Sequence, residues 1–310
     1  MRTVATWTIL VCAALGGCRT GAGRAGEPAP VAAASGAADM GGWSATWVTE
    51  GSGRPCVVVA LRDYHRRVFS TRFRELLRCS FVDVRFSVPQ ATADAARPYG
   101  IEAAVDDLEA TRRALGLDRF VLVGHSIQGS IALAYALRHP EHVLGVVAIG
   151  AVPEASPAQR ALARDYWEHV ASPERKAAYA EAQQAFASAA PGLAPAALLG
   201  ASVRADAAKR WFDPAFDERP LLEGAPINMA LLGQLSGRPF TLFSGDSRVA
   251  PPVFLAAGRH DYLSPPTGWE AHRSRFRDLT SVVFEKSGHT PQLEEAGAFD
   301  ERLAGWLRGL

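Results

Sequence analysis

Three side chains of the types that carry out acyl transfer lie at the ends of apolar stretches. Ser126 stands in a Gly-His-Ser segment between a strand-like run and a helix-like run, Asp261 ends a Gly-Arg-His-Asp segment, and His289 ends a Ser-Gly-His segment. A serine hydroxyl becomes a nucleophile when a histidine takes its proton and a carboxylate orients that histidine. The three residues therefore predict catalysis by a nucleophilic serine.

The turn around Ser126 is expected to be tight and strained, which requires small neighbours such as Gly124 and Gly129. Such a turn projects the hydroxyl outward. The N-terminus of the following helix, with the backbone N–H of Ile127, would then stabilise an oxyanion. The alternative interpretation is a structural serine in a tight turn, and the matched aspartate and histidine argue against it.

Asp261 has two competitors for the part of the carboxylate. Asp246 precedes the same strand-like run, and Glu154 follows the preceding one. We predict Asp261 because it directly follows the strand that resumes the α/β pattern, so its side chain would emerge at the carboxyl edge of the sheet.

Strand-like and helix-like stretches alternate along most of the chain, which indicates a mostly parallel sheet covered by helices on both faces. The expected strands are 43–50, 57–61, 81–86, 120–123, 143–149, 252–258 and 280–285, and the expected helices are 68–78, 101–115, 129–139 and 296–310. Side chains that follow such strands meet at one edge of the sheet.

Residues 153–250 interrupt this alternation, because they are mainly helical and contain no strong strand. We therefore expect an α/β core formed by 43–152 and 251–310, with 153–250 as a helical cap over the site. Trp211 and Glu223 are candidate substrate-binding residues of this cap.

The segments Val123-Gly124-His125-Ser126, Gly258-Arg259-His260-Asp261 and Phe284-Glu285-Lys286-Ser287-Gly288-His289 resemble the active-site segments of α/β hydrolases. The resemblance covers about residues 43–310, and the cap position with residues 285–295 looks most like the proline-iminopeptidase-like branch. It implies the α/β-hydrolase fold, with Ser126 as the nucleophile, Asp261 as the carboxylate and His289 as the general base. It also implies neither a metal nor an organic cofactor.

Three departures from the family pattern affect the site. Gln128 stands where a second small residue is usual, the His-Gly pair that supplies an oxyanion N–H is replaced by the segment 60–65, and 86–88 lack the usual glycines. We expect a backbone N–H of Leu61 or Arg62 to serve as the second oxyanion donor. His65 and Gln128 are candidate substrate-binding residues beside the site.

The resemblance implies hydrolysis of an ester or amide of a small to medium substrate, a small molecule or a peptide, through an acyl-enzyme. A peptidase that releases an N-terminal residue, often proline, and a carboxylesterase are both compatible with this chemistry. A non-catalytic surface lipoprotein that uses the fold as a binding module is the alternative of another class. The formal net charge of +1 gives no electrostatic case for nucleic acid.

The N-terminus predicts export. Residues 1–17 carry one early arginine and a short apolar core, as in a signal peptide. Leu15-Gly16-Gly17-Cys18 resembles a bacterial lipobox, so Cys18 would be lipidated, with 18–42 as a flexible tether rich in Gly, Ala and Pro. By resemblance to sorted lipoproteins, Arg19 in place of an aspartate after the lipidated cysteine implies the outer membrane. We expect contact with the membrane only through the anchor.

Cys56 and Cys79 would remain in the mature protein, in a compartment that permits disulfides. Each precedes an apolar strand-like run, and the two strands are expected to be parallel neighbours. A disulfide and two buried free thiols are both compatible with the sequence.

Overall fold

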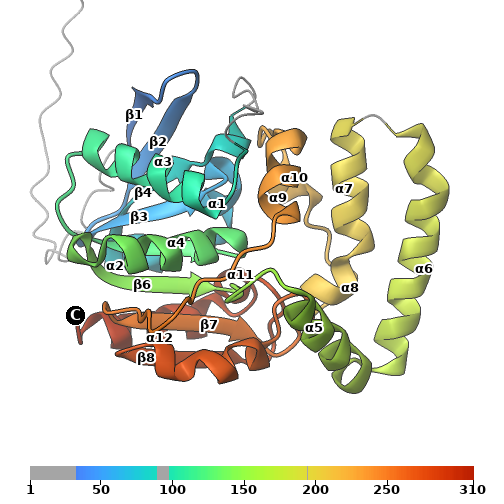
Figure 1. Cartoon of the computed structure of the whole chain (residues 1–310). Coiled ribbons are helices and arrows are strands. Elements are labelled where there is room, and N and C mark those ends of the chain that lie inside the picture. Colours follow the sequence, from blue (N-terminus) through green and yellow to red (C-terminus); the bar gives the residue numbers. More distant parts are fainter. Residues whose placement is uncertain (1–32, 89–97, 194) are drawn as a thin grey trace, which may run out of the picture. The chain divides into compact units, whose positions relative to one another are not determined.

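The computed structural model describes residues 33–88, 98–193 and 195–310, and its core is an eight-stranded sheet (Figure 1). The strands run in the order β1-β2-β4-β3-β5-β6-β7-β8. Strand β2 pairs antiparallel with β1 and β4, and all pairs from β4 onward across the sheet are parallel. The strands are β1 (Ala34–Asp39), β2 (Ser44–Glu50), β3 (Arg54–Ala60), β4 (Leu77–Asp83), β5 (Phe120–His125), β6 (Val143–Ile149), β7 (Val253–Gly258) and β8 (Leu279–Phe284). The mostly parallel α/β architecture expected from the sequence is confirmed.

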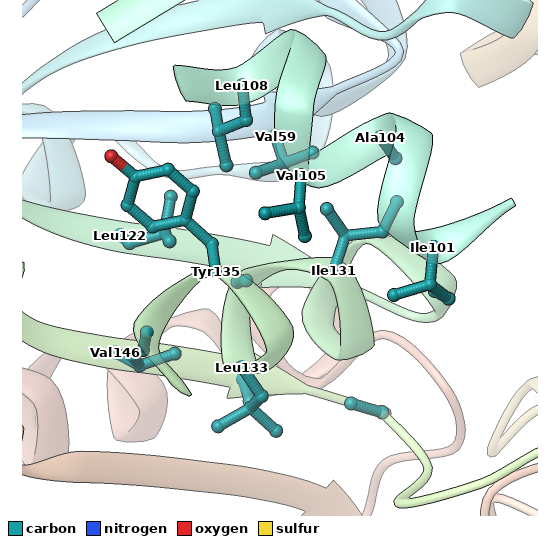
Figure 2. Close-up of a cluster of buried hydrophobic side chains, with 14 of the residues drawn as sticks. Val59, Ile101, Ala104, Val105, Leu108, Leu122, Ile131, Leu133, Tyr135 and Val146 are labelled. Atoms are coloured by element: carbon teal, nitrogen blue, oxygen red, sulfur yellow. The ribbon is translucent and has the colours of Figure 1, made fainter. Parts of the chain in front are cut away.

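Helices cover both faces of the sheet, because the central strands are apolar on both sides. Val57 and Val59 belong to one buried cluster, and Val58 belongs to the other. Figure 2 shows the first cluster, where side chains of α3 and α4 pack on Val59 and Leu122 of the sheet. The helices of this layer are α3 (Ile101–Ala114) and α4 (Ile127–Arg138), and those of the opposite layer are α1 (Arg62–Val68), α2 (Thr71–Leu76) and α12 (Ala296–Leu307).

A helical insertion separates β6 from β7, as expected for residues 153–250. Two of its helices begin with a serine cap followed by proline: the Ser156 hydroxyl accepts the N–H of Gln159, and the Ser172 hydroxyl accepts that of Arg175. The described α-helices of the insertion are α5 (Pro157–Val170), α6 (Pro173–Ala189), α7 (Pro195–Ala205), α8 (Ala207–Arg210), α9 (Arg219–Leu222) and α10 (Met229–Gly237). None of the described helices of the chain is long and apolar enough to span a bilayer.

The structure corrects the expected helix 68–78, which is replaced by the end of α1, all of α2 and the first residues of β4. Ser70 is the reason, because its hydroxyl accepts the N–H of Phe73 at 2.9 Å and so starts a new helix. Leu77 then has extended backbone angles and begins the strand.

The expected tether 18–42 is also corrected at its end. Residues 34–39 form β1, which pairs with β2 and covers the edge that β2 would otherwise expose. The expected signal peptide, the lipidation site Cys18 and the tether up to residue 32 lie outside the described residues.

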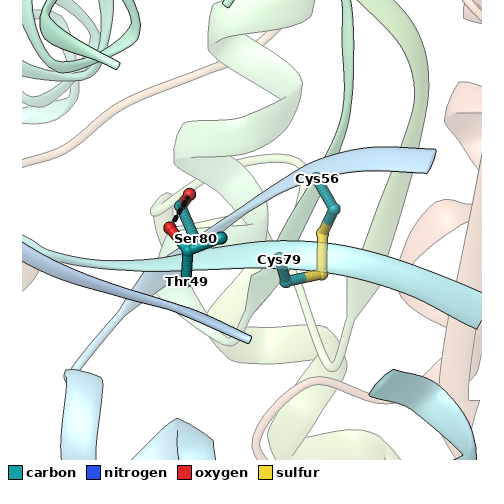
Figure 3. The surroundings of a disulfide bond; sticks show 4 residues. All are labelled: Thr49, Cys56, Cys79 and Ser80. Carbon is teal, nitrogen blue, oxygen red and sulfur yellow. Dashed lines mark hydrogen bonds between the residues drawn. A yellow bond between two sulfur atoms is a disulfide. The ribbon is translucent and has the colours of Figure 1, made fainter. Parts of the chain in front are cut away.

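Cys56 and Cys79 form a disulfide between β3 and β4 (Figure 3). They face each other directly in the parallel register, and each is 1% exposed. The bridge settles the choice that the sequence left open, and the expectation of neighbouring strands is confirmed.

We predict that alkylation of the denatured, unreduced protein leaves the peptides of Cys56 and Cys79 unlabelled, and that reduction makes both reactive. The double substitution Cys56→Ala/Cys79→Ala should lower the free energy of unfolding by about 2–4 kcal/mol, because the bridge restricts the unfolded chain. Urea unfolding measures the change. Labelling of both peptides without reductant would contradict the assignment.

Candidate active site

Ser126 lies in a strained turn between β5 and α4. Its backbone angles are φ 59° and ψ −131°, and no other non-glycine residue in the described ranges has a positive φ. Its N–H donates to the Ile149 C=O at 2.8 Å, and its C=O accepts the N–H of Gly129 at 2.9 Å. Such a conformation costs about 1–3 kcal/mol and persists only when the surroundings enforce it. The turn leaves Ser126 partly exposed at the carboxyl end of a central strand.

Glycines make this turn possible. A Cβ at Gly124 would overlap the Gln128 C=O oxygen, and a Cβ at Gly129 would lie 2.8 Å from that of Ala151. The start of α4 can therefore fold back closely on the end of β5, as the sequence predicted for small neighbours of Ser126.

Asp261 and His289 form a buried hydrogen-bonded pair. The Asp261 Oδ2 lies 2.7 Å from the His289 Nδ1, and the two residues are 0% and 2% exposed. The other oxygen of Asp261 accepts the N–H groups of Leu263 at 3.0 Å and Ser264 at 2.8 Å. These bonds fix the carboxylate, and the carboxylate fixes the imidazole. Both competing acids are placed elsewhere: Glu154 accepts the Ser156 hydroxyl, and Asp246 is exposed.

The loop that carries His289 packs tightly on the strand that neighbours β5. Gly150 follows β6 with φ 54°, and a Cβ there would lie 3.0 Å from the His289 Nδ1. The imidazole of His125, the residue before Ser126, lies 4.9 Å from that of His289. The described structure thus brings the histidine loop against the Ser126 turn from two sides.

His125 supports this loop from below. Its Nε2 lies 2.8 Å from the His289 C=O, and because a carbonyl only accepts, Nε2 must carry the proton. Burial, followed by the nearby His289 and His65, lowers the pKa of His125 well below its usual value. His125 is therefore a neutral donor that holds the main chain of His289.

The expected second oxyanion donor, a backbone N–H of Leu61 or Arg62, is corrected in part, because the Arg62 N–H is already engaged. The Arg62 N–H donates to Asp83 Oδ1 at 3.1 Å. The His65 Nδ1 lies 3.0 Å from both N and O of Leu61, so it either accepts the N–H or donates to the C=O, according to its tautomer. Arg62 is thus committed to Asp83, and Leu61 is available in one tautomer of His65 only.

The carboxylate of Asp83 ties this loop to the neighbouring strands. It accepts the Thr46 hydroxyl at 2.5 Å and the Ser87 hydroxyl at 3.2 Å, and it forms an ion pair with the Arg62 guanidinium. Burial raises the pKa of Asp83, and these hydrogen bonds and the guanidinium oppose that shift. The glycines that usually follow this aspartate are replaced by the short 3-10 helix 85–87, whose Ser87 hydroxyl bonds back to it.

The four candidate substrate-binding residues differ in burial and in hydrogen-bond partners. Gln128 is 4% exposed in the first turn of α4, beside Ile127. His65 is 1% exposed, and burial lowers its pKa to about 4, so it is a neutral structural partner of Leu61 and not a surface contact. Trp211 is buried, and its indole N–H donates to Glu218. Glu223 is exposed, and its C=O accepts the guanidinium of Arg67 at 2.7 Å.

Glu218 is the centre of a buried polar cluster that the sequence analysis missed. Its carboxylate accepts the Tyr64 hydroxyl at 3.0 Å, the Trp211 indole at 3.2 Å and two N–H groups of Arg210 at 2.9 and 3.0 Å. Tyr64 lies in the first turn of α1, and Arg210 ends α8 of the cap. The cluster therefore joins the cap to α1, the helix that follows β3. No local sequence signal pairs residues so far apart.

A groove of about 1020 Å³ lies in the cap, and Glu223 contributes to its wall. Its apolar lining residues include Leu193, Leu199, Leu222, Ile227 and Met229. None of its lining residues is Ser126, Asp261 or His289, so the groove is not by itself the reaction site. Among the described residues, no group of three or more histidine, cysteine or acidic side chains is placed to hold a metal ion.

Comparisons with known proteins agree with this geometry. A sequence model of the α/β-hydrolase fold family matches residues 85–296. The AB hydrolase superfamily protein YclE of Bacillus subtilis is 29% identical over 271 residues, which cover 86% of this chain and 96% of that protein. Two solved structures share the fold at 19% identity: the proline iminopeptidase of Mycobacterium smegmatis (TM-score 0.66, 89% of this chain and 98% of that one) and an esterase from Exiguobacterium antarcticum (TM-score 0.59, 86% and 96%).

We predict that Gly124→Ala destabilises the protein by about 1–3 kcal/mol and lowers any activity that depends on Ser126, because the new methyl group overlaps main chain at the turn. Gly233→Ala in α10 is the matched control, since a Cβ there meets no atom within 4 Å. The control should be neutral or stabilising by up to about 1 kcal/mol. Urea unfolding of both variants measures the difference, and equal stabilities would refute the steric account.

Proposed function

This chain belongs to the α/β-hydrolase fold family, and on that premise we propose that it is a serine hydrolase that cleaves a carboxylic ester through an acyl-enzyme. One observation carries the proposal. A buried Asp261–His289 pair with a 2.7 Å hydrogen bond stands against the strained turn that presents Ser126. Folding alone demands neither the buried pair nor the strain, whereas nucleophilic catalysis uses both.

In this mechanism the Ser126 hydroxyl attacks the acyl carbonyl while His289 removes its proton. The Nδ1 of His289 is engaged by Asp261, so Nε2 is the nitrogen that takes the proton. The tetrahedral intermediate collapses when His289 returns this proton to the leaving alkoxide, which departs as the alcohol. Water, activated by the same imidazole, then attacks the acyl-enzyme and frees Ser126 as the acid leaves.

The oxyanion would be stabilised at the N-terminus of α4. The N–H of Ile127 is one of the first amides of that helix, which lack an acceptor within it. For the second donor, we propose the first turn of α1 at the carboxyl end of β3, where the amides of Asp63 and Tyr64 likewise have no acceptor within the helix. This replaces Arg62, whose N–H belongs to Asp83.

One feature of the cap favours an ester over an aminoacyl amide as substrate. A peptidase that removes an N-terminal residue needs a carboxylate to hold the free amine of its substrate. In the described part of 153–250, Glu218 is the one buried carboxylate, and four donors already surround it. Glu223 is exposed on the wall of the cap groove, and neither Ser126 nor His289 lines that groove. The proline-iminopeptidase-like activity, which the sequence resemblance suggested, is therefore the second candidate.

We also propose that the folded domain lies outside the cytoplasm. The Cys56–Cys79 disulfide supports export, because such bonds persist in oxidising compartments. Lipidation at Cys18 and an outer-membrane anchor remain proposals that rest on the lipobox-like sequence alone.

We predict that the protein hydrolyses p-nitrophenyl acyl esters, and that Ser126→Ala and His289→Ala each lower kcat/KM by at least about 10⁴-fold, since members of a triad act as a unit. The wild type should turn over prolyl anilide no faster than the Ser126→Ala variant does. Steady-state kinetics on both substrates decide. Ester hydrolysis that survives Ser126→Ala would overturn the mechanism, and Ser126-dependent release of aniline would favour the peptidase.

A further inference from the structure

A single carboxylate bonds to the main chain on both sides of His289. Glu294 ends α11 (Pro291–Glu294), and its Oε2 lies 2.9 Å from the N of Gly288 and 3.3 Å from the N of Thr290. The amide of His289 itself donates to the C=O of Arg210 at 2.5 Å. All three successive amides of the histidine loop are therefore held from outside the loop.

The other oxygen of Glu294 reaches the cap. Its Oε1 accepts the N–H of Phe212 at 2.7 Å, two residues beyond the Arg210 carbonyl that holds His289. Gly288 lies so close to this stretch that a Cβ there would overlap the Arg210 carbonyl oxygen. The loop 288–290 and the cap segment 210–212 are thus linked in two ways: Glu294 accepts two amides of the loop and one of the cap, and the His289 N–H bonds directly to the Arg210 C=O.

The ionised form of Glu294 is the one that suits this arrangement, because it offers only acceptors to the three amides. Burial, with a smaller contribution from Asp261, raises the pKa of Glu294 to about 7 against the opposing effect of the amides. Arg175 of α6 also interacts electrostatically with Glu294, and Asp213 follows Phe212, whose amide Glu294 accepts. The adjacent Glu295 accepts the Lys286 N–H and the Ser287 hydroxyl at the start of the same loop. A neutral Glu294 carboxyl would present a proton to one of its three amide donors and weaken the contact.

We infer that Glu294 is a positioning residue for His289, which locks the loop of the general base to the cap so that the imidazole stays aligned between Asp261 and Ser126. The inference rests on the proposed function for its kinetic consequence but not for its structural one. The base must keep its place through both acylation and deacylation, so a loosened loop would slow both steps. Substrate binding, which depends on the pocket, would be little affected.

The test is Glu294→Gln in the full chain, with Glu301→Gln as a matched control that removes the same charge at an exposed site on α12. The glutamine has one acceptor oxygen for three amides, and its NH2 group opposes the remaining donors. We expect kcat for the ester to fall by about 10–100-fold, because small misplacements of a catalytic group cost that much. KM should change less than about threefold, and the control should match the wild type.

Two further readouts separate positioning from mere stability. The acid limb of the wild-type pH profile should be steeper than a slope of one over the range in which Glu294 becomes protonated, because that protonation adds its loss of about 10–100-fold to the requirement for a neutral His289, and Glu294→Gln should keep a slope of one. Site-resolved hydrogen exchange at Gly288 and Thr290 should be at least tenfold faster in Glu294→Gln and unchanged in Glu301→Gln. Thermal unfolding reports whether the variant remains folded under the assay conditions.

The outcomes are distinguishable from failure of the proposed function. If the wild type shows no Ser126-dependent turnover, the hydrolase proposal fails, and hydrogen exchange at Gly288 and Thr290 still decides on the lock. Unchanged exchange in a folded Glu294→Gln protein would overturn the inference. If the wild type is active, a Glu294→Gln variant with the wild-type kcat and the wild-type acid limb would also overturn the inference.

Discussion

The backbone of Ser126 is the constraint on which the rest of the site depends. A non-glycine residue at φ 59° is costly, and here the turn is held by bonds from its N–H to Ile149 and from Gly129 to its C=O. Those partners belong to β6 and α4, so the strain is balanced by the parallel sheet and the helix packed on it. Because β7 and β8 end at the same edge as β5, Asp261 and His289 emerge beside the same turn.

The cap is bound to the catalytic loops through polar contacts, and it is more than a cover over the site. Arg210 contributes twice: its carbonyl accepts the His289 N–H, and its guanidinium pairs with Glu218. Glu218 in turn holds Tyr64 on α1, whose first turn carries the proposed second oxyanion donor. Both halves of the chemistry, the base and the proposed second oxyanion donor, are thus tied to one short cap segment. Substitutions at these cap residues are therefore expected to affect catalysis as well as substrate choice.

The features that the sequence predicted correctly depend on chain order and local pattern. Apolar runs of strand length gave the parallel strands, and Ser126, Asp261 and His289 each follow one of them directly, so their convergence followed from topology. Cys56 and Cys79 are paired for the same reason, because their strands are neighbours in register. These inferences needed no knowledge of side-chain conformation.

The features that sequence reasoning missed depend on which partner a group finds after packing. Arg62 was a sensible oxyanion donor, but its N–H is bonded to Asp83, and the N–H of Leu61 is available only in the His65 tautomer that donates to the Leu61 C=O. Trp211 resembled a pocket residue, but it is buried and its indole N–H donates to Glu218. Residues 34–39 form β1 because they pair with the backbone N–H and C=O groups at the edge of β2, and not because they have strand character of their own. Long-range pairing of this kind leaves no periodic signal in the chain.

The most direct test of the central claim is reaction of the full chain with a fluorophosphonate, followed by intact mass and by mapping of the modified peptide. The account predicts one adduct, located on Ser126 and absent in Ser126→Ala, because only a serine activated by a base reacts in this way. Folded wild-type protein without an adduct would contradict the account. The fold would then serve as a binding module and not as an enzyme.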